Sequence, residues 1–476
     1  MSHSNDSLLA IPKRRVAIVG GGLVGTLAAL YFAQRGWNVD LFEKRRDVRL
    51  PENKGSVPQR SINLALSTRG ISALSKAGLD LDDSILGTVI PMRGRMIHVS
   101  EGKLKSQPYG NSHENIYSVE REFLLELLLN AAEPFNNVKF FFQHRLKRCD
   151  FDAGILEFEN TENGKMVQYT ADLIVGADGA YSTVRNQLMH IVNMDYQQEY
   201  IPHAYRELTI PSKVNENGKR EFAMESNHLH IWPRHEFMMI ALPNKNMTFT
   251  CTLFMPNEMF DAIKTDDDLI EFFQKHFPDS IPLIGEQRLK KEYFENPKGS
   301  LLSIKCKPYH YKNRVIIIGD AAHCMVPFYG QGMNCGFQDV ELLHNILEKF
   351  NITADRDNGD DNLVSAFEEF TNYRHPDAIA ICDLAMHNYI EMRSGVVNPL
   401  YLVRKRIEDW LHWMFPRSFL PLYAMISFST MRYSEALKRG RRQRLWLNAV
   451  GLFAGLGLTI FLGYRYFQSR RAVFSS

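Results

Sequence analysis

Asp320 and the glycine-rich turn that follows it are the residues of this chain whose types and spacing best suit a ligand. The apolar run 314–318, RVIII, is typical of a buried strand in a parallel sheet. Such a strand would place Asp320 at the carboxyl edge of the sheet, where open α/β sheets bind ligands. The turn 330–334 then begins a predicted helix that runs to Leu347, and the positive charge at a helix start favours a ligand that becomes anionic. Alone, the stretch would also fit an ordinary strand–turn–helix crossover.

A second glycine-rich turn lies near the N-terminus. Residues 15–19, RVAIV, form a predicted strand that leads into Gly20–Gly25. A helix is predicted over 26–35, followed by a strand over 38–42 that ends at Glu43. Glycines here allow a tight turn beneath a pyrophosphate, and the acidic residue suits ribose hydroxyls. The pattern predicts a dinucleotide-binding βαβ unit, and by itself it does not choose FAD over NAD.

A third segment repeats this design in the sequence DLIVGADGAYSTVR at 172–185. A predicted strand delivers Asp178 and Gly179 to a turn, and Thr183 and Arg185 follow at once. Together, the three segments resemble the FAD-dependent aromatic hydroxylases, which are single-component flavoprotein monooxygenases of the para-hydroxybenzoate hydroxylase type.

The resemblance implies a tightly bound, non-covalent FAD, with NADPH and O2 as co-substrates. In that family the first motif holds the ADP half of FAD, the Asp-Gly motif is associated with FAD and NAD(P)H, and the Gly-Asp motif holds the ribityl chain. This puts Asp320 on the ribityl, Met333 and Asn334 against the isoalloxazine, and Arg121 on the phosphates or ribityl. The full cofactor set so implied is Gly20, Gly22, Val24, Gly25, Phe42, Glu43, Lys44, Arg45, Ala65, Arg121, Leu146, Asp178, Thr183, Asp320, Met333 and Asn334.

Further blocks resemble the members of this family that hydroxylate kynurenine. The resemblance runs from about residue 14 to about residue 435, with small departures at Gly94 and Tyr329. It implies hydroxylation of L-kynurenine to 3-hydroxykynurenine, in tryptophan catabolism, through a flavin C4a-hydroperoxide. The blocks are RSINLALS at 60–67, PMRGRMIH at 91–98, HIWPR at 230–234, PFYGQGMN at 327–334 and NYIEMR at 388–393.

The substrate so implied has a carboxylate, for which the planar pair of donors on arginine is the usual partner. By resemblance, Arg95 and Tyr109 are the substrate-binding pair, and Asn388 and Tyr423 are the other contacts of the amino-acid group. For Tyr423, within the apolar run FLPLY, core packing is an alternative. The expected pocket is completed by Phe328, Tyr329 and Glu391.

The composition indicates an ordered globular protein of more than one domain, with 476 residues, 45% of them hydrophobic and 23% charged. The six cysteines are scattered without a C-x-x-C or other ligand spacing, so we expect reduced thiols and no metal site. The eight basic residues from 438 to the end have no acidic residue among them, and the remainder has 48 basic and 54 acidic side chains. No nucleic-acid-binding surface is therefore predicted for the body of the chain.

The C-terminal region predicts a membrane anchor. Residues 445–464 contain no charge, and a stretch of about 20 such residues is long enough to cross a bilayer. Five basic residues lie at 438–444, and Arg465, Arg470 and Arg471 follow the span. A buried terminal helix is the alternative. The resemblance adds a location in the mitochondrial outer membrane, with the catalytic domain facing the cytosol.

The expected fold is α/β. A Rossmann-like FAD-binding domain carries an inserted, mostly antiparallel substrate-domain sheet, a C-terminal helical region that completes the pocket, and a transmembrane helix. The predicted bounds are 12–90, 112–190 and 300–348 for the discontinuous FAD-binding domain, 91–111 and 191–299 for the sheet, 349–439 for the helical region and 445–464 for the anchor.

Hydrolysis has no support in the sequence, which lacks a Ser-His-Asp order, a metal-ligand cluster or paired carboxylates near a motif. Three alternatives remain open within the flavin fold: a hydroxylase of another aromatic substrate, a halogenase or saturating reductase, and a membrane-tethered scaffold without activity. The halogenase signature W-x-W-x-x-I is absent from the sequence, which disfavours that alternative.

Overall fold

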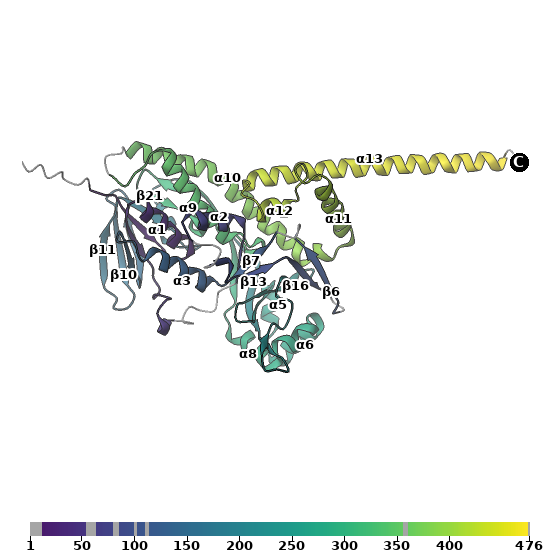
Figure 1. Cartoon of the computed structure of the whole chain (residues 1–476), viewed down its shortest axis with the longest axis horizontal. Coiled ribbons are helices and arrows are strands. Elements are labelled where there is room, and N and C mark those ends of the chain that lie inside the picture. The colour runs from purple at the N-terminus through teal and green to yellow at the C-terminus, as the bar shows by residue number, and fades with distance from the viewer. Residues whose placement is uncertain are drawn as a thin grey trace, which may run out of the picture.

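The computed structural model of the chain describes residues 12–53, 63–79, 85–99, 102–109, 114–355 and 360–474. The first three residues of the 60–67 block lie outside these ranges. Figure 1 shows a body of sheets and helices from which the last helix, α13 (Tyr433–Phe474), projects. The mixture of sheets and helices fits the predicted α/β class.

The first sheet brings the three predicted motifs to one edge. Its neighbouring strands are parallel except for one antiparallel pair, β20 with β21. Val19 pairs with Gly176, which in turn pairs with Ile317, so the three motif strands end side by side. Within the described residues the strand order is β20 (His310–Tyr311), β21 (Val315–Ile317), β12 (Leu173–Gly176), β1 (Arg15–Val19), β2 (Asn38–Phe42) and β8 (Val138–Phe141).

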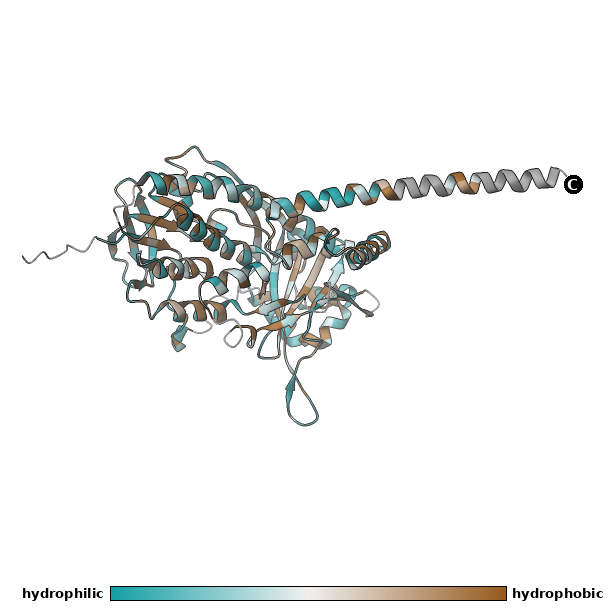
Figure 2. Ribbon diagram, turned by 45° about the horizontal axis from the view of Figure 1, so that its top comes forward, coloured by the Kyte–Doolittle hydropathy of each residue, from teal (hydrophilic) through white to brown (hydrophobic). Residues whose placement is uncertain are grey.

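The strands of this sheet are hydrophobic because both of their faces are covered. Val16, Ile18 and Ile316 have no measurable exposure. The helices packed around the sheet are α1 (Leu23–Gln34), α3 (Arg121–Ala132) and α9 (Gly332–Lys349), all of which contribute to one core. Figure 2 shows the same arrangement as hydrophobic strands inside the body and hydrophilic residues on many outer helix faces.

The second large sheet is antiparallel except where β16 runs parallel to β5. Arg95 lies on β5 and pairs with Leu229 on β16, so the sheet fixes the position of the arginine. Within the described residues the order is β19 (Gly299–Lys307), β13 (Asp195–Ile210), β18 (Phe249–Pro256), β17 (Phe237–Pro243), β16 (His228–Arg234), β5 (Gly94–His98) and β6 (Leu104–Pro108).

The helical region after α9 carries pocket residues back to the sheets. Helix α10 (Asp360–Arg393) packs on α9, on β19 and on the short turn η5 (Pro327–Tyr329). It is followed by α11 (Pro399–Met414) and α12 (Leu422–Ser427). The end of α10 therefore lies beside the loop that precedes α9.

The prediction of a transmembrane helix over residues 445–464 is wrong on the structural evidence. Within the part of the chain that the structure describes, no helix is both long enough and apolar enough to cross a membrane. Residues 445–464 are instead the middle of α13, whose first part contains the basic residues of 438–444 and is hydrophilic (Figure 2). The outer-membrane location with a cytosolic catalytic domain stays a prediction.

Candidate active site

One cavity of about 500 Å³ is lined by residues of all three motifs and by the second sheet. Of the residues predicted to contact a cofactor, Gly25 and Asn334 do not line it, and of the predicted pocket residues Glu391 does not. The predicted residues that line it are Gly20, Gly22, Val24, Phe42, Glu43, Lys44, Arg45, Ala65, Arg121, Leu146, Asp178, Thr183, Asp320 and Met333, together with Arg95, Tyr109, Phe328, Tyr329, Asn388 and Tyr423.

The N-terminal turn has the geometry that a dinucleotide requires. Helix α1 begins after Gly22 without a side-chain cap, so its first N–H groups are free of an intramolecular cap and can bind phosphate. The Glu43 carboxylate accepts hydrogen bonds of 2.9 Å from the backbone N–H groups of Gly21 and Arg45, which orient it at the end of β2. The residues present therefore fit the ADP half of FAD.

Gly25 serves the same turn through packing. A Cβ atom at this position would lie 1.9 Å from the carbonyl oxygen of Gly20, so only glycine lets α1 approach β1 this closely. The sequence fingerprint does not separate this packing glycine from the glycines that face the ligand, which is why the prediction put Gly25 in contact with the cofactor.

Asp178 builds its own turn as well as lining the cavity. It accepts hydrogen bonds from the Ser182 hydroxyl at 2.5 Å and from the backbone N–H groups of Thr183 and Val184 at 2.6 and 3.2 Å. These bonds fix the start of α4 (Thr183–Leu188). Burial raises the pKa of Asp178, while the bond from Ser182 and the backbone bonds oppose that rise.

Asp320 and Arg121 face the cavity with opposite charges. Burial raises the pKa of Asp320, and Arg121 opposes the rise. Burial lowers the pKa of Arg121, and Asp320 opposes that change. The Arg121 side chain has no hydrogen bond or close ion pair with another described residue, and it lines the cavity, so its guanidinium could bind the phosphate or ribityl oxygens of FAD.

Asn334 fastens the turn that leads into α9. Its side-chain oxygen accepts a 2.9 Å bond from the Ser67 backbone N–H, and its side-chain nitrogen donates to the carbonyl oxygens of Ala65 and Gly330 at 2.7 and 2.8 Å. Because these bonds occupy both the oxygen and the nitrogen of the amide, Asn334 stabilises the turn that forms the cavity wall and does not itself line the cavity. Its neighbour Met333 lines the cavity, and its contact with the isoalloxazine stays a prediction.

Arg95 is buried in the part of the cavity that the second sheet lines. Its Nη1 donates a 3.0 Å hydrogen bond to Glu391, and its Nε has no partner among the described residues. The guanidinium lies 4.8 Å from the ring centroid of Tyr423 and 6.0 Å from that of Tyr109. Burial opposes the charge of Arg95, but Tyr423 and Glu391 outweigh it and raise the arginine pKa.

Aromatic side chains surround this arginine. The Tyr423 ring stacks on Tyr109 at 5.2 Å and on Tyr329 at 5.5 Å, which places Tyr329 in the wall of the pocket. Phe328 stacks on Tyr389 at 3.9 Å. Burial raises the pKa of Tyr329 well above its ordinary value, so the phenol is neutral.

Helix α10 supplies Asn388 and Glu391 from far along the chain. The Asn388 side chain donates a 2.7 Å hydrogen bond to the carbonyl oxygen of Phe328, which ties α10 to η5. Glu391 lines a second cavity of about 450 Å³ that shares Arg95 and its aromatic neighbours with the first. Arg95 and a hydrogen bond from Tyr401 hold the Glu391 pKa low against the effect of burial.

Some lining residues were missed by sequence reasoning. Ile240, Leu242 and Phe254 form an apolar part of the cavity wall on β17 and β18. The short alternating strands predicted for residues 200–256 indicated the sheet but not which side chains face the ligand. Glu207 does not line the cavity but lies near Arg121, and sequence reasoning did not single it out: burial raises its pKa to about 7, and Arg121 opposes this.

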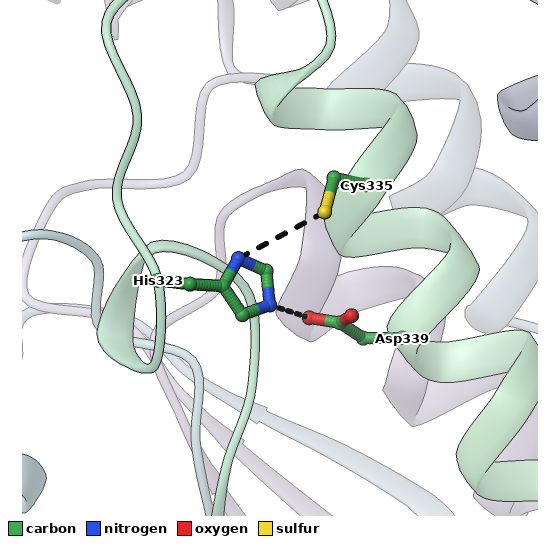
Figure 3. A group of neighbouring side chains, drawn as sticks. All are labelled: His323, Cys335 and Asp339. Atoms are coloured by element: carbon green, nitrogen blue, oxygen red, sulfur yellow. Dashed lines mark hydrogen bonds and ion pairs between the residues drawn. The ribbon is translucent and has the colours of Figure 1, made fainter. Parts of the chain in front are cut away.

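Figure 3 shows His323, Cys335 and Asp339 close together, and all three are buried. The three candidate ligand atoms lie within 4.8 Å of one another. However, Asp339 accepts hydrogen bonds from His323, from the Gly319 backbone and from Arg374. A hydrogen-bonded ion cluster therefore accounts for this arrangement without a metal ion.

Comparisons with known proteins agree with this geometry. A family model described as "FAD binding domain" matches residues 13–366. Kynurenine 3-monooxygenase of Drosophila willistoni is 47% identical over 451 residues, covering 94% of this chain and 95% of the relative. The enzyme of the same name from Sus scrofa is 45% identical and covers 94% and 90%. That of Candida albicans is 45% identical and covers 92% and 94%.

Solved structures agree in fold at low sequence identity. A tetrameric form of 2-methyl-3-hydroxypyridine-5-carboxylic acid oxygenase superposes with a TM-score of 0.63 at 21% identity, covering 82% of this chain and 95% of the other. PqsL of Pseudomonas aeruginosa, in complex with 2-aminobenzoylacetate, gives a TM-score of 0.59 at 19% identity, with coverage of 80% and 97%. From the curated relatives and the matched FAD-binding domain, the chain belongs to the kynurenine 3-monooxygenase family of FAD-dependent monooxygenases.

Proposed function

We propose that this chain hydroxylates L-kynurenine to 3-hydroxykynurenine, with FAD as its bound cofactor and NADPH and O2 as co-substrates. The names of the curated relatives support the substrate, and the matched FAD-binding domain supports the cofactor. The proposal also specifies that Arg95, Tyr109, Asn388 and Tyr423 bind the amino-acid group.

The observation that carries the proposal is the position of Arg95 in the same cavity as the three FAD motifs. A buried arginine with an unpartnered Nε and a single carboxylate partner suits a ligand carboxylate, because two parallel N–H donors match two carboxylate oxygens. The Asn388 amide oxygen and the Glu391 carboxylate are acceptors near Arg95, and they suit the ammonium group of an amino acid.

The part of the cavity beyond Arg95 suits the aromatic ring. Phe328, Ile240 and Phe254 are buried and apolar, so this region binds a flat ring and excludes water. FAD, when bound, would supply electron transfer from NADPH and the activation of oxygen. The substrate amino group supplies electron density to the ring carbon beside it, so the protein's tasks are to orient the ring, exclude water and bind the carboxylate and ammonium of the amino-acid group.

The test is a product assay with purified FAD-loaded protein, L-kynurenine, NADPH and air. The expected product is one oxygen atom heavier than kynurenine and has the retention time of 3-hydroxykynurenine. Kynurenamine, which lacks the carboxylate, is the matched control and should be hydroxylated far more slowly. NADPH oxidation with kynurenine unchanged in mass would contradict the proposed substrate.

A further inference from the structure

We propose that Asp339 and His323 are positioning residues for FAD. Asp339 fixes the turn that presents Asp320 to the cavity, and protonated His323 provides a positive charge behind that turn which favours reduced, anionic FAD over oxidised FAD. The inference rests on the FAD site and not on the identity of the substrate.

Asp339 joins three separate elements through one buried carboxylate. Its Oδ2 accepts a 2.8 Å bond from the Gly319 backbone N–H and a 2.7 Å bond from Nε2 of His323. Its Oδ1 accepts a 2.6 Å bond from Nε of Arg374 on α10. Asp339 has no measurable exposure, and His323 and Arg374 are each 2% exposed. The carboxylate therefore links the turn η4 (Gly319–Ala321) to α9 and α10.

The turn that Asp339 fixes is the one that aims Asp320. Gly319 has a backbone φ of +60°, in the left-handed region that favours glycine. A Cβ atom at Gly319 would lie 3.3 Å from the side chain of Val24, so the turn is also packed closely against α1. Asp320 is the next residue and lines the cavity. A change at Asp339 would therefore affect Asp320 in the cavity through the single peptide unit that joins Gly319 to Asp320.

Helix α9 connects this turn with the other FAD-facing turn. At its start Asn334 holds Gly330 and Ala65, and Asp339 holds Gly319 further along the same helix. The two turns are thus fixed to one rigid element. The arrangement sets the distance between the Asp320 side of the cavity and its Met333 side before any ligand binds.

The cluster also has a net charge. Burial opposes ionisation of Asp339, but His323 and Arg374 outweigh burial and hold its pKa low. Asp339 and the neighbouring Cys335 raise the pKa of His323 well above its ordinary value despite burial. Two cations thus surround one carboxylate. Other groups facing His323 are Asp320, Cys306, Tyr309 and His375.

The charge of His323 reaches the cavity. Burial raises the pKa of Asp320, Arg121 and then His323 lower it, and Asp339 acts in the opposite direction with the smallest effect of the four. A positive charge at this depth is only weakly screened by solvent, so it stabilises negative charge that develops in the cavity. Reduction of FAD at neutral pH gives an anionic form, and the α9 helix start acts in the same direction.

A metal ion would not fit this cluster well. Arg374 already donates to Asp339 and, from Nη2, to the Cys335 sulfur at 3.0 Å. A guanidinium in contact with two of the three candidate ligands repels a divalent cation. The remaining rival is a purely structural role, in which the cluster would affect stability and leave the flavin potential unchanged.

A second histidine–carboxylate pair in the chain provides a matched control for a purely structural role. His98 on β5 is 3% exposed and lies 2.7 Å from the partly exposed Asp279, so a buried histidine here forms a histidine–carboxylate pair of the same length. His98 does not line the FAD cavity. A His98→Gln variant therefore reports the effect of breaking such a pair where no FAD motif is involved.

The experiment is a redox titration of FAD in the holoenzyme without kynurenine. His323→Gln should weaken binding of reduced relative to oxidised FAD about ten-fold, which is a fall in midpoint potential of about 30 mV. His323→Lys, which keeps the charge, and His98→Gln should retain the wild-type potential. Asp339→Asn should weaken binding of oxidised FAD, because the Asp320 turn loosens.

A wild-type potential in His323→Gln would overturn the charge role, and so would an equal fall in His98→Gln. If His323→Gln does not retain FAD, 15N NMR of histidine-labelled wild-type holoenzyme decides the question. A neutral His323 at pH 7 would overturn the inference, and a protonated one would support it. Since no substrate is present, these outcomes are independent of the product assay.

Discussion

Nη1 of Arg95 donates a 3.0 Å hydrogen bond to Oε1 of Glu391, a residue 296 positions later in the chain. Arg95 lines both the cavity that contains the FAD motifs and the second cavity, while Glu391 lines the second. Without a ligand, the carboxylate of Glu391 therefore occupies part of the guanidinium that we assign to the substrate carboxylate. Binding of kynurenine at Arg95 would replace or share this contact.

Replacing Arg95 with alanine should weaken kynurenine binding and leave FAD binding intact. A hydrogen bond to a charged group contributes about 1.5–3 kcal/mol, so we expect KM to rise about 10- to 100-fold. Steady-state kinetics and the flavin absorbance spectrum measure the two effects. Arg93→Ala, an exposed arginine in the same block, is the control and should leave KM unchanged. An unchanged KM in Arg95→Ala would refute the assignment.

A Glu391→Gln variant should be less stable without ligand than the wild type. The change leaves the buried Arg95 charge without its ion-pair partner, but the Glu391 side chain is 34% exposed and solvent screens part of the loss. We expect the free energy of unfolding to fall by about 1–2 kcal/mol. Urea denaturation measures it, with Glu408→Gln as the control for a surface pair to Arg404. Equal stability would mean that Glu391 does not neutralise Arg95.

A Gly25→Ala substitution should disrupt the first motif through packing. Its Cβ would lie 1.9 Å from the Gly20 oxygen, which forces α1 away from β1. Overpacking of this kind costs about 1–3 kcal/mol or more. Gly22→Ala is the contrast, because a Cβ there meets no atom within 4 Å, so the apoprotein should keep its stability. Thermal unfolding of both apoproteins tests this, and similar losses would contradict the packing role of Gly25.

The stability of the apoprotein should depend on Glu207 near neutral pH. Burial raises its folded-state pKa to about 7. The unfolded chain has the ordinary pKa of about 4.3, so as the pH rises from there to 7 the unfolded state loses its proton first and stability falls. The total effect is on the order of 3 kcal/mol, and Glu207→Gln should remove it.

Urea denaturation at pH 5 and pH 8 measures the dependence. The wild type should lose stability between the two pH values relative to Glu207→Gln, while Glu162→Gln, at an exposed turn, should follow the wild type. Parallel pH profiles for wild type and Glu207→Gln would contradict the raised pKa.

The convergence of the three motifs could be predicted because each motif follows a strand of hydrophobic residues. Parallel strands end at one edge of a sheet, and the observed pairing of Val19 with Gly176 and of Gly176 with Ile317 is the result. The sequence does not show in the same way which motif residues face the cavity and which lie behind its wall. Gly25 and Asn334 belong to motifs, yet they support the cavity from behind, because spacing does not separate a ligand contact from a packing contact.

Other features had no signal in the sequence. Asp339 lies 16 residues from His323 and 35 from Arg374, and no motif relates these three positions. Their association depends on how α10 crosses α9, which is decided by tertiary packing. For the predicted transmembrane helix the error is the reverse, because the sequence carried a local signal that misled. An uncharged run at 445–464 predicted a membrane span, but no helix among the described residues is long and apolar enough to cross a membrane.

The most direct test of the central claim is to supply the FAD-loaded protein with L-kynurenine, NADPH and 18O2 and to measure the product by mass spectrometry. We expect 3-hydroxykynurenine that contains one labelled oxygen atom, formed by the wild type and formed far more slowly at low kynurenine concentration by Arg95→Ala, in which FAD stays bound. Unlabelled 3-hydroxykynurenine, or kynurenine left unmodified while the wild type consumes NADPH, would contradict the proposed reaction.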